Sequence, residues 1–396
     1  MKNAITEALG AFDQRENAGV DTCTTCPRLC RWACPVAEAE ARETSSPWNL
    51  VTMSGFVKRG LATPQASGDL PYHCTQCGAC TEACLHKNDV PLLLDLARAR
   101  ALAAQVAPAP IAEVRGHFAV AANAYGVPLE PALEQVTRDA DFAPRSSSVE
   151  RRADAGEDAV YLPGCATLKE RPEAASAFLK TLALRGIQGV ALTEASSSCC
   201  GLPLLWAGDI AGFRAHAERH AARLAGVKKV IVHDAGCADA LHRRYPDFGV
   251  SLEAEVVPAA TFLAEKLGVA FDEKTVPPTG MTAAAPVAYL DTCNLARAQG
   301  TVDAPRKLIQ RATGVAPCEL SGLRGRQADC CGAGGLLPRT APETARAMGE
   351  ARLDAFAKSG AQELCVATPR CAAHLARLSP TTPIVDVTTL LARLPT

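Results

Sequence analysis

The sequence predicts an α/β protein in which an N-terminal all-α domain is followed by two repeated α/β domains with mainly parallel sheets. One cysteine pattern, a single Cys, then Cys-Cys-Gly, then a single Cys, occurs twice in the C-terminal part of the chain. Around each copy, continuous apolar runs alternate with helical patterns, which is typical of a parallel sheet covered by helices. The N-terminal part instead carries two dense cysteine runs separated by helical sequence.

The two N-terminal runs have the spacing of cluster-binding loops. They read Cys23-x2-Cys26-x3-Cys30-x3-Cys34-Pro35 and Cys74-x2-Cys77-x2-Cys80-x3-Cys84, and the second is the ferredoxin run. The fourth Cys of such a run ligates the other cluster, so we expect two 4Fe-4S centres. The expected ligand sets are Cys23, Cys26, Cys30 and Cys84 for one centre and Cys34, Cys74, Cys77 and Cys80 for the other.

The first run departs from the usual pattern by one extra residue before Cys30, and Leu85 follows the second run where a Pro is common. Zinc stays an alternative, because all-thiolate zinc sites use similar Cys-x2-Cys pairs. The 39 residues between Cys34 and Cys74 suit a helical ferredoxin domain, in which helices separate the cluster loops.

The expected N-terminal helices run from residue 1 to near Gly19, from 92 to 105, from 111 to 124 and from 131 to 140. Pro91 favours the start of the second of these, and Pro108 and Pro110 end it. We therefore place a helical ferredoxin domain at 1–104 and a helical connector with a linker at 105–158. Residues 143–158 form the linker, since they offer few apolar groups to bury.

The two Cys-Cys-Gly copies are an internal repeat. The second copy follows the first by 128 residues at the leading Cys, 131 at Cys-Cys-Gly and 134 at the trailing Cys, and flanking sequence repeats with it. We place repeat one at 159–271 and repeat two at 286–396, with a boundary near 272–286. The expected metal ligands are Cys165, Cys199, Cys200 and Cys237 in repeat one and Cys293, Cys330, Cys331 and Cys371 in repeat two.

In repeat one the expected order is a strand at 159–162, a helix at 172–185, the Cys-Cys-Gly loop, a helix at 210–225 and a strand at 229–233. Cys165 and Cys237 then follow the carboxyl ends of two strands, where open α/β sheets form ligand sites. Gly201 and Gly332 are expected to bind the cofactor, because a residue without a side chain brings its N–H close to the cluster sulfur atoms.

Composition excludes several classes of protein. The 396 residues are 48% apolar, enough for real cores in two or three domains, and the net charge of −1 gives no general attraction to nucleic acid. No run of apolar residues is long enough to span a bilayer, and no signal peptide is evident at Met1, so we expect reduced thiols and a cytoplasmic protein that meets a membrane only through a partner.

Both repeats resemble the Cys-Cys-Gly domain of the heterodisulfide reductase catalytic subunit and of the iron-sulfur subunits of glycolate oxidase, anaerobic glycerol-3-phosphate dehydrogenase and lactate-utilisation proteins. A dicluster domain followed by two such repeats matches their architecture over about residues 20 to 392. The resemblance implies an electron carrier beside a flavoprotein dehydrogenase, or a disulfide reductase. The fullest family motif ends in Cys-x-x-Cys, but here the last position is Ala240 in repeat one and His374 in repeat two.

Four cysteines per repeat suffice for an ordinary 4Fe-4S centre, so we rank electron transfer above disulfide reduction. The expected cofactors are two N-terminal 4Fe-4S clusters and a further cluster in one or both repeats. The expected partners are a flavoprotein dehydrogenase and a membrane or quinone-reactive protein, since no flavin or nicotinamide fingerprint is evident. A disulfide reductase and a zinc-bound docking module are the alternatives.

Five residues outside the cysteine pattern carry weaker signals. His374 is either a ligand or, more simply, a packed side chain, and His233-Asp234 is either a proton relay or a hydrogen-bonded loop pair. Cys318 and Cys365 fall outside both motifs, and we expect them to be core residues, Cys365 in a buried strand. No catalytic residue is assigned.

Overall fold

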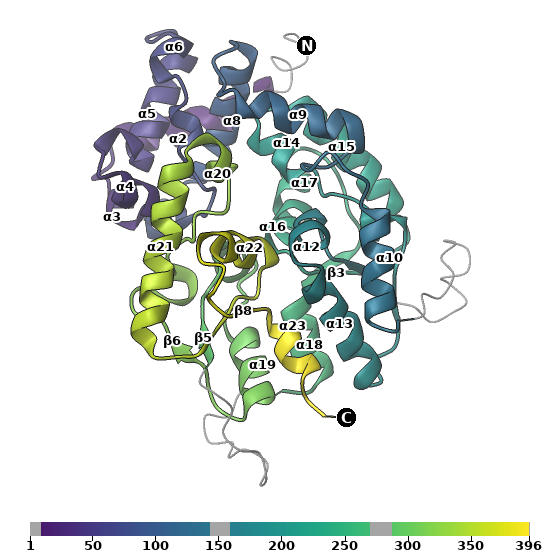
Figure 1. Ribbon diagram of the computed structural model, residues 1–396. Coiled ribbons are helices and arrows are strands. Elements are labelled where there is room, and N and C mark those ends of the chain that lie inside the picture. The colour runs from purple at the N-terminus through teal and green to yellow at the C-terminus, as the bar shows by residue number, and fades with distance from the viewer. Residues whose placement is uncertain (1–8, 143–158, 270–286, 396) are drawn as a thin grey trace.

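A computed structural model describes residues 9–142, 159–269 and 287–395. Figure 1 shows a helical N-terminal part beside α21 and α20 of the second repeat, with the two repeats and their helices filling the rest of the molecule. The predicted fold class is confirmed, because both repeats contain a parallel sheet and the N-terminal part contains helices and turns.

The N-terminal helices are short and end at the cysteine loops. Both α3 and α7 are single turns that stop immediately before Cys34 and Cys84. The bounds are α2 Asp13–Thr24, α3 Cys30–Ala33, α4 Pro35–Glu40, η1 Glu43–Ser45, α5 Pro47–Lys58, α6 Pro64–Ser67, η2 Leu70–Tyr72, α7 Ala79–Ala83 and α8 Val90–Ala103.

The expectation that the first helix ends near Gly19 is wrong, because α2 continues to Thr24 and carries Cys23. Gly19 serves packing rather than termination, since a Cβ there would lie 2.9 Å from both Asn88 Oδ1 and Leu93 Cδ1. The other predicted helices agree with α8 and with the connector helices α9 Pro110–Ala121 and α10 Glu130–Asp139 to within a few residues.

Repeat one contains a parallel sheet in the order β2-β1-β3-β4. All four residues of β1 and the last three of β3 are buried, as expected for strands covered on both faces. The strands are β1 Ala159–Leu162, β2 Val190–Ala191, β3 Lys229–Val232 and β4 Glu255–Pro258, and the helices are α12 Cys165–Glu170, α13 Pro172–Leu184, η3 Glu194–Ser197, α14 Leu202–Trp206, α15 Ile210–Arg223, α16 Ala235–Asp239, η4 Ala240–Arg244, α17 Tyr245–Asp247 and α18 Ala259–Lys266.

The second repeat has the same topology, with the strand order β6-β5-β7-β8 and parallel pairing throughout. The strands are β5 Val287–Tyr289, β6 Cys318–Glu319, β7 Glu363–Cys365 and β8 Ile384–Val385, and the helices are η5 Asn294–Ala298, α19 Asp303–Thr313, η6 Gly325–Gln327, α20 Leu337–Thr340, α21 Pro342–Ser359, α22 Pro369–Leu378 and α23 Val387–Ala392. Both η4 and η5 are π-helical turns close to a trailing or leading cysteine, a placement common at functional sites.

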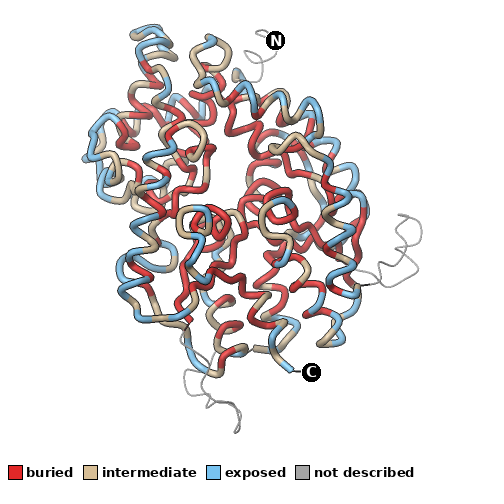
Figure 2. Tube along the Cα trace, in the orientation of Figure 1, coloured by how far each residue is buried: buried red, intermediate tan, exposed pale blue. Residues whose placement is uncertain are grey.

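The cores of the two repeats are continuous. Buried apolar residues of β1, α13 and α18 join those of α19 and α23 in one cluster, and Figure 2 shows buried chain running through the centre of the molecule. The linker at 143–158 and the second boundary at 272–286 both lie outside the described residues. The domain limits 1–104, 105–158, 159–271 and 286–396 therefore stay predictions.

The expectation for the two extra cysteines holds for one of them. Cys365 is fully buried in β7, whereas Cys318 is only partly buried, because β6 is a two-residue strand at the edge of its sheet. Within the described residues, no helix has both the length and the apolar character needed to cross a membrane.

Candidate metal centres

The first N-terminal set brings together Cys23, Cys26, Cys30 and Cys84, because α3 packs on α7 and carries the two runs side by side. Trp48 Nε1 donates to the Cys23 carbonyl at 2.5 Å, and Asn88 Nδ2 donates to Cys23 Sγ at 3.2 Å. Burial, together with the neighbouring thiols and against the hydrogen bond from Asn88, raises the pKa of Cys23 to about 11. A cavity of about 40 Å³ lies against all four cysteines.

The second N-terminal set contains the expected Cys34, Cys74, Cys77 and Cys80. Cys34 lies near Cys77 and Cys74, and Cys80 lies near the other three and near Cys30 of the first set. Burial raises the pKa of Cys74 to about 12. The crossed pairing predicted from the ferredoxin run is thus present in the arrangement of the thiols.

In repeat one, the four predicted cysteines meet at the carboxyl edge of the sheet. The sulfur atoms of Cys165 and Cys199 lie 3.3 Å apart, and those of Cys200 and Cys237 also lie 3.3 Å apart. All four side chains are at most 3% exposed. Gly164 allows this approach, because a Cβ there would lie 3.1 Å from Cys237 Sγ.

The Cys-Cys-Gly loop of repeat one is held by its own repeat. His216 Nε2 donates to the Cys199 carbonyl at 2.7 Å, and the Tyr245 hydroxyl donates to the Cys200 carbonyl at 2.9 Å. Gly201 has a φ of +81°, and its N–H donates to Cys199 Sγ at 3.5 Å, as expected for a glycine that turns the backbone toward sulfur.

The thiols of repeat one differ in acidity. Hydrogen bonds from Cys199 and Cys237 hold the pKa of Cys200 well below its ordinary value, while its own hydrogen bond to Cys165 raises the pKa of Cys199. The thiolate is the form of cysteine that binds metal.

In repeat two, Cys330 contacts Cys293 and Cys331, and Cys331 contacts Cys371, so the predicted four cysteines also converge. The hydrogen bond with Cys293 raises the pKa of Cys330. Gly332 has a φ of +93°, its N–H donates to Cys330 Sγ at 3.5 Å, and a Cβ there would lie 2.6 Å from the Ala345 carbonyl oxygen.

Repeat two also meets the second N-terminal set. The thiols of Cys77 and Cys330 are hydrogen-bonded to each other. A Cβ at Gly335 would lie 2.1 Å from the Cys74 carbonyl oxygen, and one at Gly334 would lie 2.3 Å from the Thr75 carbonyl oxygen. The glycines of the Cys-Cys-Gly-Ala-Gly-Gly loop therefore let two cysteine loops touch through their backbones.

The donor chemistry of all four sets fits iron-sulfur clusters. Each set offers four sulfur atoms. In the two repeats most of these sulfur atoms are buried, and backbone N–H groups point toward them. Across the described residues, no group of three or more Cys, His, Asp or Glu side chains is arranged to hold a single metal ion.

The histidines and the aspartate singled out in the sequence all form hydrogen bonds in the structure. His374 Nε2 donates to the Ala345 carbonyl at 3.1 Å, which favours the packing role. His233 pairs with the Tyr161 hydroxyl at 2.6 Å and with Asp386 at 3.2 Å, whereas Asp234 accepts from Gly236 N at 2.9 Å, so the two residues have separate hydrogen-bond partners.

Sequence reasoning missed two buried arginines, Arg297 and Arg370. Arg297 lies four residues after Cys293, and Arg370 directly precedes Cys371 but approaches the thiols of repeat one. Their adjacency to cysteines was the available signal, yet only the tertiary structure shows which thiols each one faces.

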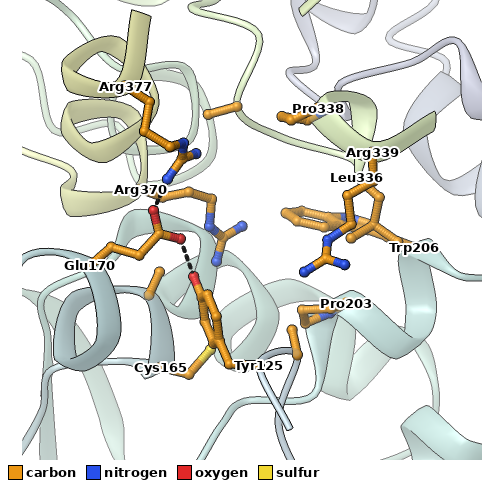
Figure 3. A pocket seen from close by; sticks show the side chains of 13 residues that line it. Tyr125, Cys165, Glu170, Pro203, Trp206, Leu336, Pro338, Arg339, Arg370 and Arg377 are labelled. Atoms are coloured by element: carbon orange, nitrogen blue, oxygen red, sulfur yellow. Dashed lines mark hydrogen bonds and ion pairs between the residues drawn. The ribbon is translucent and has the colours of Figure 1, made fainter. Parts of the chain in front are cut away.

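A cavity of about 280 Å³ opens beside Cys165, between repeat one, repeat two and the connector. Figure 3 shows Arg370 between Tyr125 and Trp206, and the Tyr125 hydroxyl donating to Glu170, which is ion-paired with Arg377. The guanidinium of Arg370 lies 4.9 Å from the Trp206 ring centre and 3.2 Å from Asp234. Cys165 is the one predicted ligand on the wall of this cavity.

Two family models match the chain. A 4Fe-4S dicluster domain matches residues 19–88, and a cysteine-rich domain matches residues 159–242 and 287–376. The chain belongs to the cysteine-rich-domain iron-sulfur proteins. Together the matched ranges include every cysteine of the four sets.

Two of the relatives are subunits of reductases. The chain is 26% identical to a subunit of the fumarate reductase (CoM/CoB) of Methanothermobacter marburgensis, over 87% of its own length and 65% of that relative. It is 27% identical to a subunit of the dihydromethanophenazine:CoB–CoM heterodisulfide reductase of Methanosarcina barkeri, over 90% of this chain and 88% of that one. Lactate utilization protein A of Oceanobacillus iheyensis is 26% identical over 39% of the chain and 62% of its own length. The chain thus spans slightly less than two thirds of the fumarate reductase relative.

Proposed function

We propose that the protein is the iron-sulfur electron-transfer subunit of an oxidoreductase. It takes electrons from a flavoprotein dehydrogenase of the 2-hydroxyacid or glycerol-3-phosphate type and passes them toward quinone or another carrier. In this proposal the two N-terminal sets each hold a 4Fe-4S cluster and the repeats hold one or two more. Such clusters, when bound, take up and release single electrons.

One observation carries the proposal: three of the four cysteine sets, the two N-terminal ones and that of repeat two, lie next to one another in a series. Cys80 of the second set lies near Cys30 of the first, and Cys77 of the second set contacts Cys330 of repeat two. Structural metal sites do not need to lie next to one another, whereas a series of electron carriers does.

The first set offers a place for a donor protein. Leu29 and Leu85, which line the cavity beside its cysteines, are 44% and 81% exposed, and Trp32 on α3 is 81% exposed. Large apolar side chains that stay exposed beside a redox site are typical of a protein-protein interface. This supports a flavoprotein partner that docks at the N-terminal domain.

Metal analysis of the chain purified without oxygen tests the proposal. We expect about 12 to 16 irons per chain, with matching sulfide, because each cubane holds four irons. Zinc should be nearly absent. Eight irons with zinc in the repeats would instead support the docking-module alternative and would refute electron transfer through the repeats.

The second candidate function is a thiol-disulfide reductase, and the cavity beside Cys165 favours it. That cavity gives a small molecule access to one thiol of repeat one, and Tyr125 supplies a hydroxyl group there. Two relatives are named for heterodisulfide or CoM/CoB chemistry. Against it stand Ala240 and His374, which occupy the positions of the fifth thiolate.

Assays of the isolated chain with an artificial reductant separate the two functions. A carrier subunit should be reduced and reoxidised by dyes without releasing thiol from a disulfide. A reductase should release two thiols per disulfide, and Tyr125→Phe should then lower the rate while iron content stays unchanged.

A further inference from the structure

Arg297 is a buried cation between two of the cysteine sets. It belongs to η5, directly after Cys293, and is 9% exposed. Its Nε donates to the Cys77 carbonyl at 2.7 Å, and its Nη1 donates to the carbonyl oxygens of Ala328 at 2.6 Å and Arg326 at 3.1 Å. Among the described residues, no carboxylate forms an ion pair with it.

The negative charge available to Arg297 comes from thiols. Burial lowers its pKa, but the thiols of both sets outweigh burial, so that the pKa of Arg297 is raised. The thiols responsible are Cys77 and Cys80 of the second N-terminal set and Cys293 and Cys330 of repeat two. A single guanidinium thus faces both sets.

One part of the guanidinium is unused by the protein. Arg297 Nη2 is buried and has no hydrogen-bond partner among the described residues. A buried donor left unpaired costs about 1–3 kcal/mol, and an ionised one costs more. A sulfur acceptor at either set would satisfy this donor, and hydrogen bonds to cluster sulfur are one of the means by which proteins set reduction potentials.

We propose that the guanidinium of Arg297 lies between the second N-terminal cluster and the cluster of repeat two, and that its positive charge raises the reduction potential of both. This rests on the proposed function, which places clusters at these two sets. A nearby positive charge stabilises the reduced form, which carries one more negative charge. Because one guanidinium faces both sets, its charge would shift both potentials in the same direction.

Arg370 is the natural control, because it also faces cysteine thiols but is differently paired. It faces Cys237, Cys165 and Cys200 of repeat one, and its charge is offset by Asp234 at 3.2 Å. Its removal should therefore affect the repeat-one signal alone.

The test is a redox titration followed by electron paramagnetic resonance on the full chain with its clusters. Spectra of Cys331→Ser and Cys200→Ser assign the signals of the repeats. In Arg297→Gln we expect the one-electron reduction equilibrium of two centres, the second N-terminal one and that of repeat two, to weaken at least tenfold, which is about 59 mV for one electron. Arg297→Lys should recover most of the shift, since it keeps the charge.

Other outcomes decide the matter as well. Loss of iron from only those two centres in Arg297→Gln, with retention in Arg297→Lys, also supports the inference. Full iron content with unmoved potentials in Arg297→Gln overturns it, and so does loss of iron from all centres in both variants, which would show a general folding role. A wild-type chain with only eight irons refutes the proposed function instead, and is seen before any variant is made.

Discussion

The two repeats share one cysteine pattern and one sheet topology, yet they meet the N-terminal domain in different ways. Repeat two touches it at the cluster loops, where Gly334 and Gly335 lie against the backbone of Cys74 and Thr75. Repeat one touches it away from its cysteines, through polar contacts of Arg98 with the Trp206 carbonyl and of Arg244 with Asp89. The cysteines of the two copies are thus placed differently: those of repeat two continue the series of sites, and Cys165 of repeat one lies on the wall of the cavity.

The difference extends to how each Cys-Cys-Gly loop is supported. In repeat one, His216 and Tyr245 bind the carbonyl oxygens of the two adjacent cysteines. In repeat two, the loop instead lies against the backbone of Cys74 and Thr75 of the N-terminal domain, and Arg297 donates to the Ala328 carbonyl two residues before Cys330. We therefore expect repeat one to keep its geometry when the N-terminal domain is perturbed, and repeat two to lose it.

The largest effect should come from removing one thiolate in each repeat. Both Cys200→Ser and Cys331→Ser should lose roughly four irons per chain if both repeats hold a cubane. Only Cys331→Ser should also disturb an N-terminal signal, because its neighbour Cys330 contacts Cys77. Iron analysis and electron paramagnetic resonance measure both effects.

Cys318→Ser is the control for these variants, since Cys318 lies in the edge strand β6 outside the four sets. Its spectrum should equal that of the wild type. Equal disturbance of the N-terminal signal by Cys200→Ser and Cys331→Ser would remove the proposed difference between the repeats.

The next effect concerns the contact at Gly335. Gly335→Ala should lower the free energy of unfolding by about 2–4 kcal/mol, because a Cβ would clash with the Cys74 carbonyl oxygen at 2.1 Å and φ is +63°. Thermal unfolding followed by circular dichroism measures it. Gly360→Ala has a similar φ of +72° with open space around it, so it reports the backbone cost alone.

The difference between these two alanine variants isolates the steric clash. Gly335→Ala should also lower iron content at the second N-terminal site. An equal loss of stability in both variants would mean that the backbone contact between the loops contributes nothing.

The smallest effect concerns the polar contact with repeat one. Burial raises the pKa of Asp95 to about 7, against attraction from Arg244 and Arg98, and both of its carboxylate oxygens lack a hydrogen-bond partner among the described residues. The ordinary pKa of an aspartate carboxyl is 3.8. As the pH rises from that value to about 7, the carboxyl of Asp95 loses its proton in the unfolded chain and keeps it in the folded chain. Stability therefore falls across that range and stays lowered above it.

Asp95→Asn should accordingly raise the free energy of unfolding by about 1–3 kcal/mol at pH 8, and by little near pH 4. Asp89→Asn is the matched control with the opposite sign. The ion pair with Arg244 outweighs burial and holds the pKa of Asp89 below its ordinary value, so its loss should destabilise the protein at pH 8. Denaturant unfolding at two pH values checks both, and a destabilised Asp95→Asn would contradict the assignment.

Much of this architecture follows from the sequence by itself. Cysteine spacing and the apolar strands determined the fold class, the order of elements and the crossed grouping of Cys34 and Cys84, because thiolates must reach fixed positions on a cluster and parallel strands must be buried. The internal repeat likewise determined that Cys165 and Cys237 meet at the carboxyl edge of a sheet.

Only the tertiary structure decided how the parts meet. No local pattern shows that Gly335 touches Cys74, that Arg297 faces two sets of thiols, or that Arg370 of repeat two approaches the cysteines of repeat one. These contacts join residues far apart in the chain. They depend on how whole domains pack against one another, whereas apolar periodicity and cysteine spacing in the sequence describe only the structure within each domain.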